Sequence, residues 1–159
     1  MSRDGRIRTG GLSVPNAARC QTALRPDRSS LGPRWARSTL TGVQLVLVAD
    51  STWVRNDVSA SLPSSDWSVH HADPRVVVEA VANHPSDAVV IDMQIGSMGG
   101  MAVVRRLREA MAMGQIEPTR LILLLDRSAD RFLAHRAGAD VGLLKPFTAQ
   151  EFRGALYPD

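Results

Sequence analysis

Five short apolar segments alternate with longer stretches in which apolar residues recur every three or four positions. The segments read VQLVLV, WSVHH, AVVI, LILLL and VGLL, at residues 43–48, 67–71, 88–91, 121–125 and 141–144. Four of them are apolar throughout and rich in branched side chains, which is typical of parallel strands buried on both faces. WSVHH is the weakest of the five, because polar residues interrupt it.

The stretches between these segments predict five helices. Four are expected over residues 52–62, 74–83, 101–113 and 129–137, and the fifth begins after residue 148. Asp73 followed by Pro74 is typical of a helix start, and Gly138 of a helix end. Thr148 and Glu151 have the spacing of a capping box, in which each side chain bonds the other residue's backbone N–H.

Strand and helix therefore alternate five times along the chain. This rhythm indicates βαβ units with right-handed crossovers and a parallel sheet that is covered by helices on both faces. The sequence predicts a doubly wound α/β domain.

Composition and charge divide the chain into two parts. Of the 159 residues, 44% are apolar and 22% charged, as in a soluble globular protein. Residues 1–40 hold eight arginines and two acidic residues, a net charge of +6, whereas residues 41–159 hold eleven basic and fourteen acidic residues, a net charge of −3. We expect residues 1–40 to be a disordered Arg-rich N-terminal extension and residues 41–159 to form the domain.

The extension has three interpretations. Its arginines and Trp35 suit an arm for nucleic acid or anionic lipid; it is otherwise a solvated tail, or upstream sequence translated from a misassigned start. The single cysteine, Cys20, excludes an intramolecular disulfide. No uninterrupted apolar run is longer than the five residues Leu121–Leu125, far fewer than the roughly 20 residues of a membrane span.

Charged residues follow four of the five predicted strands. They are Asp50, Asp92, Asp126 and Lys145. A charge at one strand end commonly marks the return to solvent, but ligands of open α/β sheets bind beyond the carboxyl ends of the strands. Lys145 is the only lysine among 19 basic residues. It is either an incidental surface residue or a position that needs a compact charge on a flexible stem.

The order and surroundings of these residues resemble the receiver domain of bacterial response regulators. The resemblance rests on Asp50, on the segment DAVVIDMQIGSMGG at residues 87–100, on Gly-Ala-Asp at residues 138–140, and on Lys145-Pro-Phe. It covers residues 43–157, and the segment from residue 124 to residue 140 is similar to atypical receivers of high-GC actinobacteria.

The resemblance implies a (βα)5, flavodoxin-like fold with strand order 2-1-3-4-5. It implies that Asp92 accepts a phosphoryl group from a histidine kinase or another phosphodonor. Asp50, Asp92 and the main-chain carbonyl of Gln94 match the family's Mg²⁺ ligands, Lys145 matches the residue that pairs with the phosphoryl oxygens, and the peptide bond before Pro146 is expected to be cis.

Five positions depart from the family pattern. Gly96 replaces a proline and Gly99 replaces an acidic residue, which is expected to leave a looser loop after Asp92. Ala49 replaces an acidic residue, which is expected to weaken Mg²⁺ binding or leave the site without the ion. Gly142 replaces an aromatic residue that reports the switch. Asp126 replaces Thr or Ser, and an ionised carboxylate only accepts hydrogen bonds. Two like charges about 4 Å apart repel by roughly 4 kcal/mol at an effective dielectric of 20, so Asp126 is expected to be protonated or paired with Lys145.

The leading hypothesis is therefore a stand-alone, atypical, cytoplasmic receiver that signals through an unknown downstream protein. The chain ends just after the fifth predicted helix, so we expect no DNA-binding domain; the sequence leaves a homodimer open. The expected contact face is the fourth helix, fifth strand and fifth helix, with Arg127, Arg131 and His135 as candidates. The alternatives are a pseudo-receiver that binds its partner without phosphorylation, and a metal-dependent enzyme acting on a small molecule or nucleotide.

Overall fold

The computed structural model describes residues 42–62 and 67–157, so the Arg-rich segment 1–40 lies outside the described residues. The elements in chain order are β1 (Val43–Val48), α1 (Thr52–Ala60), β2 (Trp67–His71), α2 (Val77–Asn83), β3 (Ala88–Asp92), α3 (Gly100–Ala112), β4 (Arg120–Leu125), the 3₁₀ helix η3 (Ser128–Asp130), α4 (Arg131–Ala137), β5 (Val141–Leu144) and α5 (Ala149–Leu156). All five predicted strands are present.

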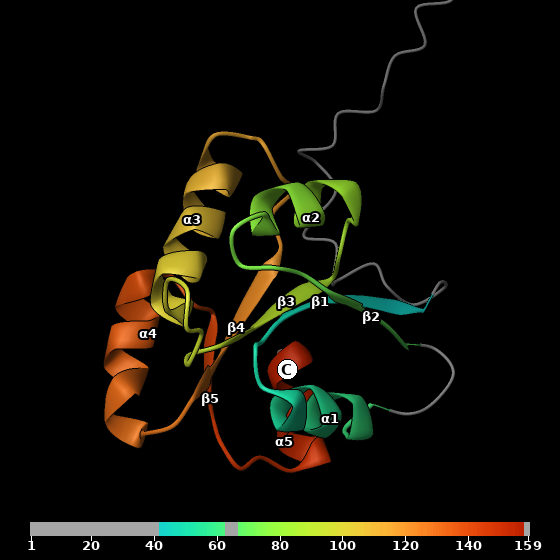
Figure 1. Ribbon diagram of the computed structural model, residues 1–159, viewed down its shortest axis with the longest axis vertical. Helices are drawn as coiled ribbons and strands as arrows, with labels where there is room; N and C mark the ends of the chain where they lie inside the picture. Colours follow the sequence, from blue (N-terminus) through green and yellow to red (C-terminus); the bar gives the residue numbers. More distant parts are fainter. Residues whose placement is uncertain (1–41, 63–66, 158–159) are drawn as a thin grey trace, which may run out of the picture.

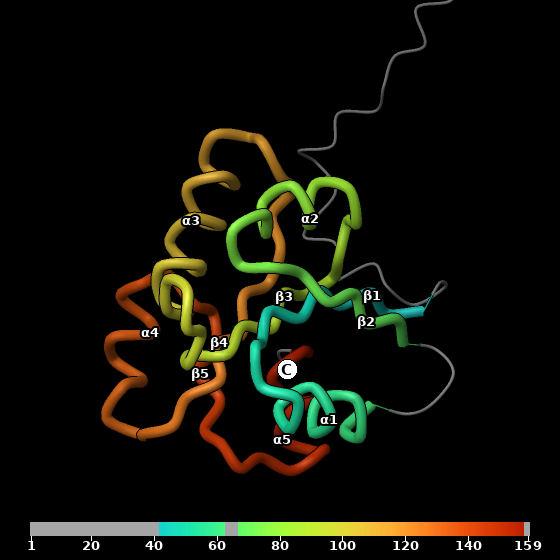
Figure 2. The backbone as a smooth tube through the Cα atoms, viewed as in Figure 1, coloured from blue at the N-terminus to red at the C-terminus, as the bar shows by residue number. Residues whose placement is uncertain are grey.

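The strands form one parallel sheet in the order β2-β1-β3-β4-β5, which confirms the expected doubly wound (βα)5 fold. Helices α1 and α5 cover one face of the sheet, and α2, α3 and α4 cover the other (Figure 1). The chain passes repeatedly from a strand to a helix and back to a parallel strand, as the tube in Figure 2 shows. Such crossovers place the carboxyl ends of all five strands at one edge.

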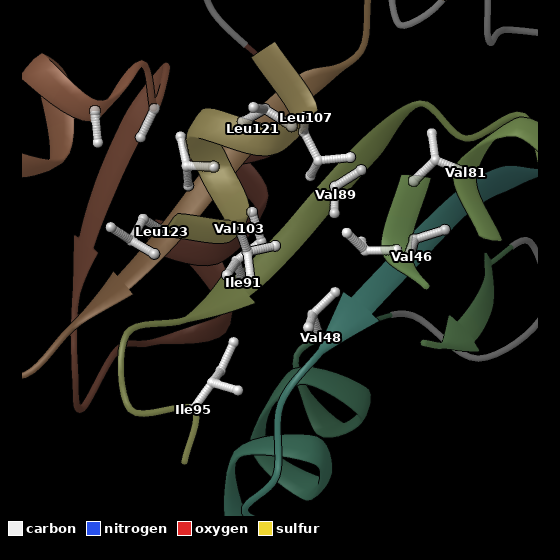
Figure 3. Packing of buried hydrophobic residues seen from close by; sticks show 14 of the residues in the cluster. Val46, Val48, Val81, Val89, Ile91, Ile95, Val103, Leu107, Leu121 and Leu123 are labelled. Carbon is white, nitrogen blue, oxygen red and sulfur yellow. The ribbon is translucent and has the colours of Figure 1, made fainter. Parts of the chain in front are cut away.

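Each central strand contributes to two hydrophobic cores, because successive side chains point to opposite faces. On β1, Val46 and Val48 belong to the core covered by α2, α3 and α4, whereas Leu45 and Leu47 belong to the core covered by α1 and α5. Figure 3 shows the first of these cores. Burial on both faces explains why these segments are apolar throughout. The edge strand β2 pairs only with β1 and is partly exposed, which explains its mixed sequence.

Two carboxylates, one on buried Asp87 and one on exposed Asp140, bind neighbouring strands at the amino edge of the sheet. Asp87 Oδ2 accepts from the Gln44 N–H (2.8 Å), and the Gln44 carbonyl accepts from the Asp87 N–H (2.8 Å). Asp140 Oδ2 and Leu121 form a matching reciprocal pair, at 2.7 and 2.9 Å. Arg108 of α3 adds an ion pair to Asp140 Oδ1 (2.6 Å). These contacts fix the offset between neighbouring strands, and therefore the positions of their opposite ends.

Two helix starts differ from the sequence prediction by more than one residue. Helix α2 begins at Val77 rather than Pro74, because the Asp73 carboxylate accepts from the Arg75 N–H (2.7 Å) and closes a turn before the helix. The predicted helix over residues 129–137 begins as the 3₁₀ helix η3 and becomes α-helical only at Arg131.

Two other local predictions are confirmed. Gly138 ends α4 in the left-handed conformation, with φ of 103°. The Thr148 side chain and Glu151 form the complete capping box of α5. The hydrogen bonds from Thr148 to the Glu151 carboxylate lower the pKa of that exposed side chain below its ordinary value.

The glycines of two helices give a matched test of this packing. A Cβ on Gly100 would collide with the carbonyl oxygen of Asp92 and lie 2.8 Å from Met93 Cα, whereas a Cβ on Gly154 of α5 would meet nothing within 4 Å. We expect Gly100→Ala to lower the free energy of unfolding by about 1–3 kcal/mol or more. Gly154→Ala should instead raise it, by up to roughly 1 kcal/mol, because alanine favours helix. Urea unfolding of both variants tests this; equal effects would contradict it.

Candidate functional site

The carboxyl edge of the sheet brings together the four charged residues predicted from the strand ends. Asp50 follows β1, Asp92 is the last residue of β3, Asp126 follows β4 and Lys145 follows β5. Lys145 is held to the end of β4 by its N–H, which donates to the Leu125 carbonyl (2.8 Å). The ends of β3, β4 and β5 therefore converge on one ammonium ion.

Lys145 Nζ makes two ion pairs. It lies 2.7 Å from Asp92 Oδ1 and 3.1 Å from Asp126 Oδ1. The side chains of Lys145 and Asp92 are 4% and 2% exposed, and that of Asp126 is 33% exposed. A buried charge is tolerated only when it is paired and hydrogen-bonded, and here each buried ion supplies the other's partner. The peptide bond from Lys145 to Pro146 is cis, as the resemblance implied.

Asp126 adopts one of the two arrangements predicted for it. Its carboxylate is paired with Lys145, so the ammonium already holds an anion on the β4 side. The position that carries a hydroxyl donor in the family therefore carries an acceptor in this chain.

The loop after β3 connects Asp50 with Asp92. The Gly96 N–H donates to Asp50 Oδ2 (2.9 Å), and the Gln94 N–H lies 3.3 Å from Asp92 Oδ1. The five-residue segment 92–96 thus hydrogen-bonds to both carboxylates, and Gln94 is its middle residue. This arrangement places the three predicted metal-ligating residues in one connected unit.

The oxygen donors of this unit are of the type that magnesium prefers. Mg²⁺ usually takes one or two protein carboxylates and completes its shell with other oxygens, largely water. Asp50 and Asp92 supply two carboxylates, and the Gln94 carbonyl is the third candidate. Over residues 42–62 and 67–157 there is no group of three or more His, Cys, Asp or Glu side chains placed to hold a metal ion. The candidate set is therefore sparse, and it includes no carboxylate at Ala49, which is buried in the core under α1 and α5.

Gly142 leaves no open slot for a rotating aromatic side chain. A Cβ on Gly142 would lie 2.8 Å from Leu125 Cδ1 and 3.6 Å from Ala134 Cβ. Leu125 therefore occupies this space between β5 and α4.

Of the residues predicted at the contact face, Arg131 and His135 line a shallow hollow over β5, whereas Arg127 is exposed beside Asp126.

Trp53 is a site residue that the sequence analysis missed. Helix α1 buries Val54 and Val58, which are four positions apart, whereas Trp53 lies off that stripe and is 52% exposed. Its ring centroid is 5.1 Å from Lys145 Nζ, within the range of a cation–π contact. The only sequence signal was its offset from the i, i+4 pattern, which does not say what the ring covers.

The histidines lie away from this edge. His70 of β2 stacks on His84, with ring centroids 3.9 Å apart, and no third ligand joins them among the described residues. Partial burial and the charges of Arg55 and His70 lower the pKa of His71, which favours its neutral form. No helix in the described residues is long and apolar enough to span a membrane.

Comparison with known proteins agrees with this architecture. The sequence model of the response regulator receiver domain matches residues 45–157. The response regulator MprA of Mycobacterium sp. (strain KMS) is 33% identical over 110 residues, which cover 69% of this chain and 46% of that protein. The chain thus spans about half the length of the curated relatives it matches.

Two solved structures share the fold. The Vibrio cholerae chemotaxis protein CheY4 has a TM-score of 0.62 at 22% identity, covering 73% of this chain and 97% of that one. The signal receiver domain of the response regulator NarL from Mycobacterium tuberculosis has a TM-score of 0.60 at 26% identity. The match covers 73% of this chain and 94% of that one.

The buried ion pair predicts a specific pattern of stabilities. Lys145→Met keeps the volume of the side chain but leaves the Asp92 carboxylate buried without its cation, and should lower the free energy of unfolding by roughly 3–5 kcal/mol. Asp92→Asn in the Lys145→Met background should restore much of that loss, because no buried charge remains. Urea unfolding of the single and double variants measures the coupling. A loss under about 1 kcal/mol for Lys145→Met would show that the pair is solvated.

Proposed function

Because this chain belongs to the response regulator receiver domain family, we propose that it acts in two-component signalling by accepting a phosphoryl group on Asp92. The observation that carries the proposal is the 2.7 Å contact between buried Asp92 and Lys145 at the carboxyl edge of the sheet. A carboxylate is a competent nucleophile, and a fixed ammonium beside it favours the negative charge of the transferred group.

The transfer uses the Asp92 oxygen that Lys145 does not hold. Oδ1 accepts from Lys145 Nζ and lies 3.3 Å from the Gln94 N–H, whereas no donor in the described part of the chain reaches Oδ2. Oδ2 attacks the phosphorus of the donor, and an O–P bond forms as the P–N bond of a phosphohistidine, or the P–O bond of acetyl phosphate, breaks. The leaving group takes the electron pair of the broken bond.

Asp50, Asp92 and the Gln94 carbonyl would hold Mg²⁺ in this proposal. The ion, when bound, neutralises charge between the Asp92 carboxylate and the phosphoryl oxygens. The Gly96 N–H orients the Asp50 carboxylate through its 2.9 Å hydrogen bond. With Ala49 in the place of a second acidic residue, we expect low Mg²⁺ affinity.

Asp126 disfavours the phosphorylated state of Asp92 that this transfer produces. A phosphoryl group on Asp92 has to share Lys145 with a carboxylate that is already 3.1 Å from its Nζ. Where the family has a hydroxyl donor, this chain has a further acceptor and a further negative charge, so phosphorylation is expected to be less favourable than in a receiver with Thr or Ser.

The same observation favours a second candidate, a pseudo-receiver whose contact surface is set without phosphorylation. The Asp126–Lys145 ion pair already provides an anion next to Lys145, and Leu125 fills the space beside Gly142. In that case the end of β4 and the start of α4 are held in one arrangement whatever the state of Asp92. No contact in the described residues specifically favours the metal-dependent enzyme.

The proposed partners are a sensor histidine kinase, or another phosphodonor, and a downstream protein. The face made of α4, β5 and α5, with Arg131 and His135, is the proposed contact surface. Since this chain spans only 46% of the length of the MprA relative, the expected absence of a DNA-binding domain stays a prediction.

The acceptor role predicts a covalent product. With Mg²⁺ and acetyl phosphate, the intact mass of the parent should rise by one phosphoryl group, and that of Asp92→Asn should not. Asp130→Asn is the matched control, since it removes a carboxylate of η3 outside the ion-pair cluster and should leave the mass gain intact. A folded parent that gains no mass would favour the pseudo-receiver.

Replacing Asp126 tests the repulsion separately. Asp126→Thr removes the charge and supplies a hydroxyl donor, so it should tighten the binding of the phosphoryl mimic beryllofluoride by roughly tenfold or more. Asp126→Asn, which removes only the charge, should fall between the parent and the threonine variant. Calorimetric titration in the presence of Mg²⁺ measures all three affinities. Equal affinities for the parent and Asp126→Thr would contradict the repulsion.

A further inference from the structure

The ammonium ion of Lys145 is enclosed on three sides. An ammonium has three N–H donors. Asp92 and Asp126 accept at 2.7 and 3.1 Å, and the ring of Trp53 lies over the remaining side, with its centroid 5.1 Å from Nζ. The Lys145 side chain is only 4% exposed. A phosphoryl oxygen can therefore approach this ammonium only by displacing one of the three groups.

The backbone holds Trp53 at the rim of the site. Trp53 is the second residue of α1 and comes three positions after Asp50. The Arg55 side chain fixes this helix start, because its Nε–H donates to the Ala49 carbonyl at the end of β1 (2.9 Å). Buried Val54 and Val58 attach another face of α1 to the core. Figure 1 shows α1 and α5 on the same face of the sheet, and Arg153 of α5 donates to the Ser61 carbonyl just after α1 (3.3 Å).

Of the three groups around the ammonium, the indole is the easiest to move. Asp92 is 2% exposed and belongs to β3, and Asp126 is held by its ion pair with Lys145. Trp53, in contrast, is 52% exposed, and its indole N–H donates no hydrogen bond within residues 42–62 and 67–157. Only side-chain rotation is needed to take its ring off the ammonium.

We propose that Trp53 is a gate on Lys145: its ring competes with a phosphoryl group for the ammonium ion and moves aside when that group binds. This inference rests on the proposed phosphoryl-binding function and adds a specificity-determining residue to it. An exposed cation–π contact corresponds to a factor of about two to five in an equilibrium constant. Trp53 should weaken phosphoryl binding by that factor.

The affinity for beryllofluoride tests this competition. Trp53→Leu keeps an apolar side chain but lacks a π face, so it should bind beryllofluoride about two- to fivefold more tightly than the parent in calorimetric titration with Mg²⁺. Trp53→Phe, which keeps an aromatic ring, should lie between the leucine variant and the parent. Trp67→Leu is the control, because Trp67 packs against Tyr157 and not at this site.

The emission of Trp53 gives a readout that a purely structural role would not move. In a variant with Trp35→Phe and Trp67→Phe, Trp53 is the sole tryptophan. Its emission should shift to longer wavelength as beryllofluoride binds. The beryllofluoride concentration at the midpoint of this shift should match the midpoint of the calorimetric titration.

Equal beryllofluoride binding by the parent and Trp53→Leu, including no binding by either, would overturn the gate whatever the mass measurement on Asp92 shows. Tighter binding by Trp53→Leu without any phosphoryl gain on Asp92 would support the gate and overturn the acceptor role.

Discussion

The site depends on one buried ammonium ion. Lys145 is the only lysine of the chain, its side chain is 4% exposed, and its charge is balanced by Asp92 and Asp126. Removing an ammonium from water is costly unless carboxylates surround it, so the ends of β3, β4 and β5 have to stay together once the fold forms. The carboxylate contacts of Asp87 and Asp140 at the opposite edge set the strand offsets that make this convergence possible.

The same ion explains why this receiver domain has two candidate modes of action. A lysine that holds Asp92 in place suits phosphoryl transfer, whereas a lysine that is also held by Asp126 and covered by Trp53 is already satisfied without a phosphoryl group. Which mode dominates depends on a competition between anions for one cation, modified by a half-exposed ring. Under the proposed function, the carboxylate of Asp126 would act directly on this competition, whereas the missing acid at Ala49 would act through the supply of oxygens to Mg²⁺.

The sequence predicted the strands and their alternation with helices well, because burial on both faces leaves a continuous apolar run. It also predicted which charged residues meet, since parallel strands end at one edge. The strand order and the cis bond before Pro146 came from the family resemblance. The failures have two causes. The Asp73 side chain closes a local turn where a helix was expected. Trp53 lies off the apolar stripe of its helix and against Lys145, a residue distant in the sequence that no local pattern contains.

The central claim is that both carboxylates hold the Lys145 ammonium ion. Because the chain has a single lysine, labelling with ¹⁵N-lysine gives one side-chain ammonium signal in a nuclear magnetic resonance spectrum. Its proton exchange with water should be slow, and its chemical shift should change in both Asp92→Asn and Asp126→Asn. The claim would be contradicted if the ammonium protons exchange with water as fast as those of a solvated lysine. It would also be contradicted if the ammonium chemical shift is the same in Asp126→Asn as in the parent.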